Sequence, residues 1–164
     1  MAVFVFFAAG LAVLAVLNAQ NAAVKKQLQD DAEFLIISGD IEHKITMAEF
    51  QTLELHDIQA NYKKSGKAPE TRVYTGIAFA NVLQSKNIST NGISKAVFGA
   101  ADLYHSALSI DDALDIENCF IVIKEDGKPL GKRADGGTGP FRMILATDQF
   151  SQRWCSFLTE VTLT

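Results

Sequence analysis

The chain has 164 residues, of which 48% are hydrophobic and 21% are charged, as is usual for a globular protein that buries its own core. Its 15 basic and 19 acidic residues give a formal net charge of −4, which argues against a nucleic-acid-binding protein, because such proteins gather Lys and Arg against phosphates. Two cysteines are too few for a disulfide scaffold or a four-thiolate zinc site.

The N-terminal segment, residues 1–24, carries no charged side chain, and Lys25 is the first charged residue. Its apolar run from Ala2 to Leu17 is shorter than the roughly 20 residues of a membrane span. The run has the size of the apolar core of a signal peptide, and small residues around Ala19 offer a cleavage site. No Lys or Arg precedes the run, so an uncleaved anchor stays open, as does a buried helix.

Three regions follow from this pattern. We predict a signal peptide or N-terminal membrane anchor over 1–24, a polar tether over 25–33 and one folded domain over 34–164. The domain is then exported to the periplasm, and only an uncleaved N-terminus would hold it at the membrane.

The first half of the domain alternates short strands with short helices. Strands are predicted at 34–37, 41–45, 56–62 and 71–74, and helices at 47–53 and 77–84. Thr46, followed three residues later by Glu49, fits a capping box that starts the first helix. Thr75-Gly76 is interpreted as a turn that leads into the second helix.

The second half continues the pattern. Strands are predicted at 95–98, 103–108, 119–124, 141–146 and 161–163, and helical turns at 151–157. Ser109 with Asp112 three residues later indicates another helix start. Many short strands with a few short helices, and no linker within the domain, predict the α+β fold class.

The sequence contains few candidate residues for metal binding or thiol chemistry. Three histidines are scattered along the chain without a metal-binding spacing: His43, His56 and His105. Cys119 and Cys155 are interpreted as buried thiols that pack as small hydrophobic groups, and a disulfide in an oxidising compartment stays open. Asp102 and Ser106 flank a histidine, but neighbours on a strand point to opposite faces and do not form a triad.

A glycine-rich loop, 135–140, is the segment most suggestive of a ligand. Its three glycines allow close approach and could expose amide donors, although a mobile hairpin loop is the alternative. Arg142 then enters an apolar strand, where a buried guanidinium requires an acceptor. That acceptor is either an internal carboxylate or a polar ligand.

An ordered series of motifs resembles the small stand-alone form of the sulfite-oxidase-type molybdopterin-binding domain. The motifs are Tyr74-Thr75-Gly76-Ile77, Ala101-Asp102-Leu103-Tyr104, Asp126-Gly127-Lys128-Pro129-Leu130, Gly139-Pro140-Phe141-Arg142-Met143-Ile144-Leu145, Arg153-Trp154 and Glu160-Val161-Thr162-Leu163. The resemblance spans about 34–163. Leu103 replaces the usual glycine of its motif, and the opening strand pair at 36–45 lacks its proline.

One departure bears on activity. Enzymes of this family hold molybdenum through a cysteine thiolate in the region that corresponds to 55–72, and this region contains no cysteine. The resemblance therefore implies a non-catalytic binding protein that takes a pterin or molybdopterin-like ligand with no metal. It also implies a membrane sensor of the cyclic di-GMP type as partner. A molybdopterin-dependent oxidoreductase-like enzyme and a ligand-free interaction module are the alternatives.

The expected ligand site combines the residue types that a flat, polar ring requires, at positions that match the family motifs. The candidate ligand-binding residues are Phe98, Asp102, Tyr104, Thr138, Gly139 and Arg142. Each has a structural alternative: core packing for Phe98 and Tyr104, a turn cap for Asp102 and an ion pair for Arg142.

Overall fold

The computed structural model describes residues 17–21, 27, 30–63 and 68–164, which fall in two units, Met1–Ala32 and Glu33–Thr164. In the first unit, 17–21 are helical, and the rest of the predicted signal peptide or anchor lies outside the described residues. So does part of the predicted tether, 25–26 and 28–29. Within the described part of the chain, no helix combines the length and apolar character needed to span a membrane.

The second unit confirms the α+β fold class. Its strands are β1 (Glu33–Ser38), β2 (Ile41–Thr46), β3 (His56–Tyr62), β4 (Glu70–Ala78), β5 (Lys95–Ala100), β6 (His105–Ser109), β7 (Cys119–Glu125), β8 (Lys128–Pro129), β9 (Arg142–Leu145) and β10 (Leu158–Leu163). Its helices are α2 (Met47–Gln51), α3 (Phe79–Ser85) and α4 (Ile110–Leu114), and its 3₁₀ turns are η1 (Arg133–Asp135) and η2 (Ser151–Arg153).

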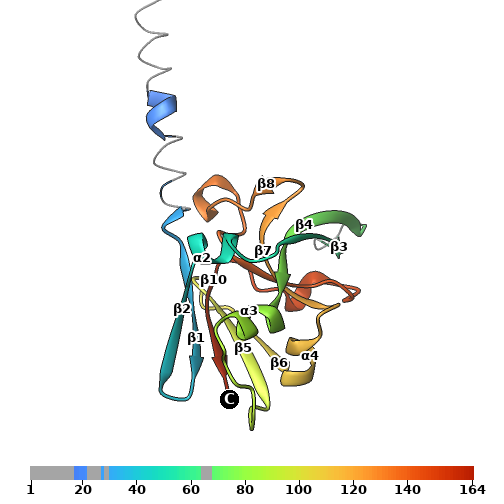
Figure 1. Cartoon of the computed structure of the whole chain (residues 1–164). Helices are drawn as coiled ribbons and strands as arrows, with labels where there is room; N and C mark the ends of the chain where they lie inside the picture. The colour runs from blue at the N-terminus through green and yellow to red at the C-terminus, as the bar shows by residue number, and fades with distance from the viewer. Residues whose placement is uncertain (1–16, 22–26, 28–29, 64–67) are drawn as a thin grey trace, which may run out of the picture. The chain divides into compact units, whose positions relative to one another are not determined.

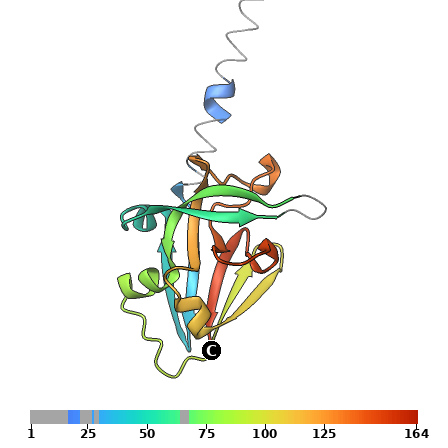
Figure 2. The ribbon, with the colours of Figure 1, turned by 90° about the vertical axis from the view of Figure 1, so that its right-hand side faces the viewer.

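The strands form two sheets (Figures 1 and 2). The first has the order β2-β1-β10-β5-β6, and the second has the order β3-β4-β7-β8, with β9 also paired to β7. The last strand, β10, lies parallel to the first, β1, while the other pairs are antiparallel. The first and last strands of the unit are therefore neighbours in one sheet.

Aromatic side chains fill the core. Phe141 lies edge-to-face against Phe34 and Phe50, with ring centroids 4.9 and 5.3 Å apart, and all three are fully buried. Phe79 and Phe98 form a similar pair at 5.0 Å. Such pairs contribute about 0.5–1.5 kcal/mol each beyond their buried area.

Both predicted helix starts are confirmed. The Thr46 hydroxyl accepts the amide of Glu49 at 3.2 Å, and the Glu49 carboxylate accepts the amide of Thr46 at 3.0 Å, which completes the capping box of α2. The Ser109 hydroxyl accepts the amide of Asp112 at 3.1 Å at the start of α4.

The predicted turn at Thr75-Gly76 is wrong, because β4 continues to Ala78 and α3 begins only at Phe79. Gly76 serves close packing instead of a turn. A Cβ atom there would lie 2.1 Å from the carbonyl oxygen of Ile121 on β7, so only glycine allows the two strands to approach at this point.

Several predicted boundaries also shift. The first helix ends at Gln51, β6 begins only at His105, and the helical turns over 151–157 reduce to η2. Leu103 lies in a left-handed turn with φ of 68°, which interrupts the strand predicted there. The open question of a disulfide is answered: Cys119 and Cys155 are buried free thiols, and burial raises the pKa of Cys155 to about 12.

Candidate functional site

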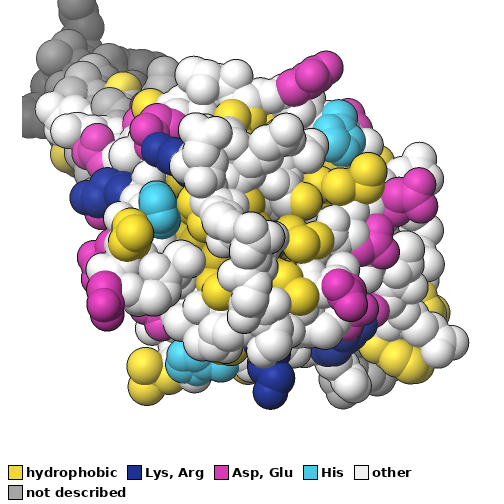
Figure 3. All heavy atoms as spheres, turned by 60° about the horizontal axis from the view of Figure 1, so that its bottom comes forward, with side chains coloured by type: hydrophobic (Ala, Val, Ile, Leu, Met, Phe, Trp, Pro, Cys, Tyr) yellow, Lys and Arg dark blue, Asp and Glu magenta, His cyan; other side chains and the backbone are white. Residues whose placement is uncertain are grey.

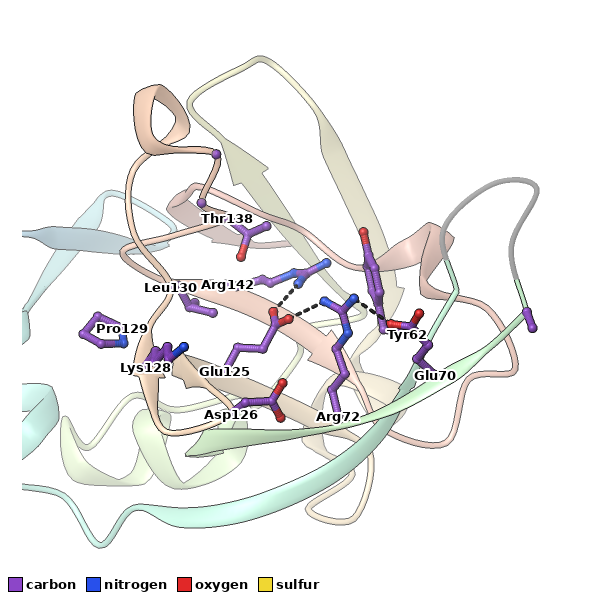
Figure 4. A pocket seen from close by; sticks show the side chains of 13 residues that line it. Tyr62, Glu70, Arg72, Glu125, Asp126, Lys128, Pro129, Leu130, Thr138 and Arg142 are labelled. Atoms are coloured by element: carbon purple, nitrogen blue, oxygen red, sulfur yellow. Dashed lines mark hydrogen bonds and ion pairs between the residues drawn. The ribbon is translucent and has the colours of Figure 1, made fainter.

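A cavity of about 490 Å³ lies where five segments meet. Its walls are the ends of β3 and β4, the turn from β7 to β8, the residues after η1, and the first residue of β9 (Figure 4). This volume falls within the range of small-molecule sites.

Strand register assembles the charged side chains of the cavity. Tyr74 of β4 pairs with Glu125 of β7, and Val122 of β7 pairs with Arg142 of β9. The Val73 amide also donates to the Asp126 carboxylate at 3.1 Å, which fixes the end of β7 against β4. Residues from three separate strands therefore face one space.

Arg142 is a buried and poorly compensated charge of the cavity. Its side chain is only 5% exposed, and neither Nε nor Nη1 has a hydrogen-bond partner among the described residues. Oε2 of Glu125 lies 3.6 Å from Nη1, which is an ion pair without a hydrogen bond. Burial lowers the pKa of Arg142, since it disfavours the cation. A buried charge is costly without hydrogen-bonding partners, so this guanidinium points to a polar ligand.

Aromatic rings surround the same guanidinium. Its carbon lies 4.9 Å from the ring centre of Trp154, 5.4 Å from that of Tyr62 and 5.9 Å from that of Tyr74. The rings offset part of the burial cost by cation–π attraction. They accept no strong hydrogen bond, so Nε and Nη1 stay without a hydrogen-bond partner among the described residues.

Glu125 is shared between two arginines. One oxygen, Oε1, accepts a hydrogen bond from Arg72, which also donates to Glu70 at 2.9 Å. Burial disfavours the Arg72 cation, but these two hydrogen bonds outweigh it and raise the pKa of Arg72. Arg72 also stacks over the ring of Tyr62 at 4.2 Å. This leaves Oε2 of Glu125 facing Arg142 (Figure 4).

Tyr74 is a second buried polar group without a partner. Its ring is fully buried, and its hydroxyl has no hydrogen-bond partner among the described residues. Burial raises the pKa of Tyr74 to about 12, so the hydroxyl stays protonated at neutral pH. Tyr74 packs near Arg142, whose guanidinium carbon lies 5.9 Å from its ring centre, but it is not among the residues that line the cavity.

Two of the predicted site residues line this cavity, Thr138 and Arg142. The expectation of free loop amides is wrong, because the amides of Thr138 and Gly139 donate to the carbonyls of Leu130 and Gly131 at 3.0 and 2.9 Å. The glycines instead allow this close packing: a Cβ on Gly139 would lie 2.5 Å from that of Leu130. Thr138 therefore presents its side chain to the cavity (Figure 4).

Four predicted residues lie outside the cavity lining, Gly139 among them. Phe98 is fully buried in the core. Asp102 lies 3.6 Å from Arg133, and the Tyr104 hydroxyl donates to the Gln152 carbonyl at 2.7 Å. Their role in binding stays a prediction.

The turn that carries Asp102 is nevertheless linked to the loop of Thr138. The Ala101 amide donates to the Phe157 carbonyl at 3.0 Å, and the Phe157 amide donates to the Thr138 carbonyl at 2.9 Å. Phe157 therefore connects the two halves of the predicted site, the turn of Asp102 and the loop of Thr138.

Sequence reasoning missed several cavity residues: Tyr62, Glu70, Arg72, Glu125 and Asp126. Tyr62 ends a predicted strand, and the other four are charged residues at or next to the ends of predicted strands, but nothing local indicated that these ends meet.

A molybdenum centre held by a protein thiolate does not fit this donor set. The wall that corresponds to the thiolate-bearing region of the family contributes Tyr62, Glu70 and Arg72, and neither cysteine lines the cavity. Within the described residues, no group of three His, Cys, Asp or Glu side chains could hold a metal ion. A flat organic group with hydrogen-bonding atoms does fit, because it would partner the guanidinium of Arg142.

Comparisons with known proteins bear on the fold. Neither a family model nor a curated protein matches the sequence. Among solved structures, the sulfane dehydrogenase SoxCD from Paracoccus pantotrophus is similar, with a TM-score of 0.66 over 82% of this chain at 12% identity. The match covers 38% of that chain, so this protein corresponds to well under half of it. The likeness agrees with the fold expected from the sequence motifs, and it concerns the fold alone.

Proposed function

We propose that this chain is a binding protein for a pterin-class small molecule, held in the cavity at Arg142. The observation that carries the proposal is a buried guanidinium with two unpartnered nitrogens beside a cavity of about 490 Å³. A pterin is flat, fits a cavity of this size and offers ring acceptors to a donor-only guanidinium.

Three of the lining residues have a defined role in this proposal. Arg142 donates to an acceptor of the ring, and Tyr62, which Arg72 stacks against, supplies an aromatic wall. The Thr138 side chain faces the same space and can donate or accept (Figure 4).

The wider role rests on the sequence. The charge-free segment before Lys25 supports export to the periplasm, by a signal peptide or an anchor. The family resemblance supports a membrane sensor of the cyclic di-GMP type as partner. On the face shown in Figure 3, acidic and basic side chains of the described residues are scattered and form no basic patch, which agrees with a ligand other than nucleic acid.

Non-catalytic binding is favoured over an oxidoreductase-like role because the cavity lacks a thiolate to hold molybdenum. The observation that favours the oxidoreductase-like role is the fold likeness to a sulfane dehydrogenase. Elemental analysis of protein from a molybdenum-replete host separates the two. Stoichiometric molybdenum together with sulfite or sulfoxide turnover would establish the enzyme.

Fluorescence titration of the full chain with pterin tests the proposal. Arg142→Met keeps the length of the side chain and removes its donors, so it should weaken binding at least tenfold. Arg133→Met is the matched control, because Arg133 is 72% exposed and lies outside the cavity lining. Undiminished pterin affinity in Arg142→Met would contradict binding in this cavity. If the wild type does not bind pterin at all, the ligand-free interaction module would be favoured.

A further inference from the structure

We infer that the cavity recognises the lactam edge of its ligand, that is, a ring N–H next to a ring carbonyl. The inference rests on the proposed function in taking a fused heterocycle as the ligand. It adds which edge of the ring is bound and which analogues are rejected.

A carboxylate oxygen of Glu125 lies beside nitrogens of Arg142 that have no hydrogen-bond partner among the described residues, and both side chains line the cavity. Oε1 of Glu125 is engaged by Arg72, while Oε2 lies 3.6 Å from Nη1 of Arg142, too far for a hydrogen bond. Nε and Nη1 of Arg142 have no partner among the described residues. The two groups therefore attract each other as charges but leave hydrogen-bonding capacity unused.

The polarity of this pair is fixed. A carboxylate only accepts hydrogen bonds, and a guanidinium only donates them. A ligand edge that satisfies both must offer a donor to Glu125 and, next to it, an acceptor to Arg142. A lactam has this order, since its ring N–H donates and the adjacent carbonyl oxygen accepts.

The neighbours of the pair hold it in this state. Arg72 is bonded to both Glu70 and Glu125, so it keeps the Glu125 carboxylate in place. The three aromatic rings around Arg142 restrict where its guanidinium can turn. The Glu125 carboxylate cannot donate a hydrogen bond and the Arg142 guanidinium cannot accept one, so neither can adapt to a ligand with the opposite arrangement.

Pterin and guanine both carry the lactam edge, and each has a diamino analogue with the edge reversed. In 2,4-diaminopteridine and in 2,6-diaminopurine riboside, the ring nitrogen accepts and the adjacent amino group donates. Bound in the same pose, these analogues would place acceptor against acceptor at Glu125 and donor against donor at Arg142. Because sites that hydrogen-bond a ligand reject analogues that leave buried groups unpaired, we expect the analogues to bind at least tenfold more weakly.

Isothermal titration of the full chain with pterin, 2,4-diaminopteridine, guanosine and 2,6-diaminopurine riboside tests the inference. At least tenfold tighter binding of pterin than of 2,4-diaminopteridine supports both the inference and the proposed function. Discrimination within the purine pair alone supports lactam recognition and overturns the pterin proposal. Equal binding within the pteridine pair, or preference for the diamino member, overturns lactam recognition and leaves pteridine binding intact. Failure of all four compounds to bind overturns both.

The Glu125→Gln variant tests whether Glu125 accepts the hydrogen bond from the ring N–H of the lactam edge. An amide can both donate and accept, so the preference for pterin over 2,4-diaminopteridine should fall at least threefold in this variant. Glu117→Gln is the matched control, because it removes the same charge from an exposed position outside the cavity lining. An unchanged preference in a folded Glu125→Gln variant would overturn the role of Glu125. If this variant fails to fold, the wild-type comparison decides the inference alone.

Discussion

Leu103 adopts a left-handed backbone conformation, with φ of 68°, while 84% of its surface is exposed. This conformation costs a residue with a Cβ about 1–2 kcal/mol, and glycine avoids that cost. Burial of the leucine side chain does not offset it. The sequence motif indicated the same point, since glycine is usual at this position in the family that the chain resembles.

We expect Leu103→Gly to raise the free energy of unfolding by about 0.5–1 kcal/mol, after the larger entropy loss of glycine on folding is subtracted. Urea denaturation measures the change. Leu103→Ala, which keeps the Cβ, should gain nothing and serves as the control. A lower free energy of unfolding in Leu103→Gly would mean that this turn is not strained.

Asp102→Asn separates the two locations considered for the ligand. Asp102 accepts the Tyr104 amide at 3.4 Å and pairs with Arg133, but it does not line the cavity. If the ligand lies at Arg142, pterin affinity should not change, and stability should stay within about 0.5 kcal/mol of the wild type. A tenfold or greater loss of affinity in a pterin titration would place the ligand at the Asp102 turn, as the sequence indicated.

The candidate site could be predicted in part. Arg142 stood out because a charged residue in an apolar strand requires a partner, and Thr138 stood out through its glycine-rich loop. Glu125 and Arg72 could not be found in this way. They meet because β4 pairs with β7 in one particular register across 53 residues of chain, and that register is set by long-range packing.

At the scale of elements, the helix starts were the most predictable features. Thr46 with Glu49, and Ser109 with Asp112, satisfy backbone amides only three residues away, so the sequence alone contains the interaction. Gly76 misled the prediction for the opposite reason. Its role depends on Ile121, a residue far away in the chain.

Gly76→Ala should break the contact between β4 and β7. The added methyl would lie 2.1 Å from the Ile121 carbonyl oxygen and 2.7 Å from the Cα of Val122, both of which are backbone atoms that cannot step aside. We expect a loss of about 3 kcal/mol or a failure to fold, as for severe overpacking. Gly92→Ala is the control: its φ is +78°, but no atom lies within 4 Å, so only about 1 kcal/mol should be lost. Similar losses for both variants in urea denaturation would contradict the packing role of Gly76.

The cap of α2 predicts an acid-sensitive contribution to stability. Glu49 accepts hydrogen bonds from Lys86 at 2.8 Å and from the Thr46 amide, and these lower its pKa from 4.5 to about 2. The unfolded chain therefore takes up this proton first as the pH falls. The contribution is complete above about pH 4.5 and disappears as the pH falls toward about 2.

Glu49→Gln should lose stability near neutral pH and show a shallower decline across that range. Because the Glu49 side chain is half exposed, solvent screens the interaction and the difference should be small. Denaturation at a series of pH values compares the variant with the wild type. Parallel curves from pH 5 down to pH 2 would contradict the shifted pKa.

For the whole molecule, the poorly paired guanidinium of Arg142 is a cost to the ligand-free state, and the proposed ligand would remove that cost. The two sheets hold Arg142 at the edge of the core with its guanidinium buried and incompletely paired. Replacing buried charges by apolar side chains of similar size is often neutral or stabilising when no unpaired charge is left behind, and Glu125 keeps its hydrogen bond from Arg72 when Arg142 is replaced. Binding function and stability should therefore respond in opposite directions at this residue.

Thermal unfolding of the wild type and Arg142→Met, each with and without pterin, tests this claim most directly. Without pterin, the variant should unfold at the same temperature as the wild type or at a higher one. Pterin at a hundred times its wild-type dissociation constant should stabilise the wild type by about 2.7 kcal/mol and the variant by about 1.4 kcal/mol or less, while Arg133→Met should respond as the wild type does. Equal stabilisation of Arg142→Met and the wild type by pterin would contradict the account.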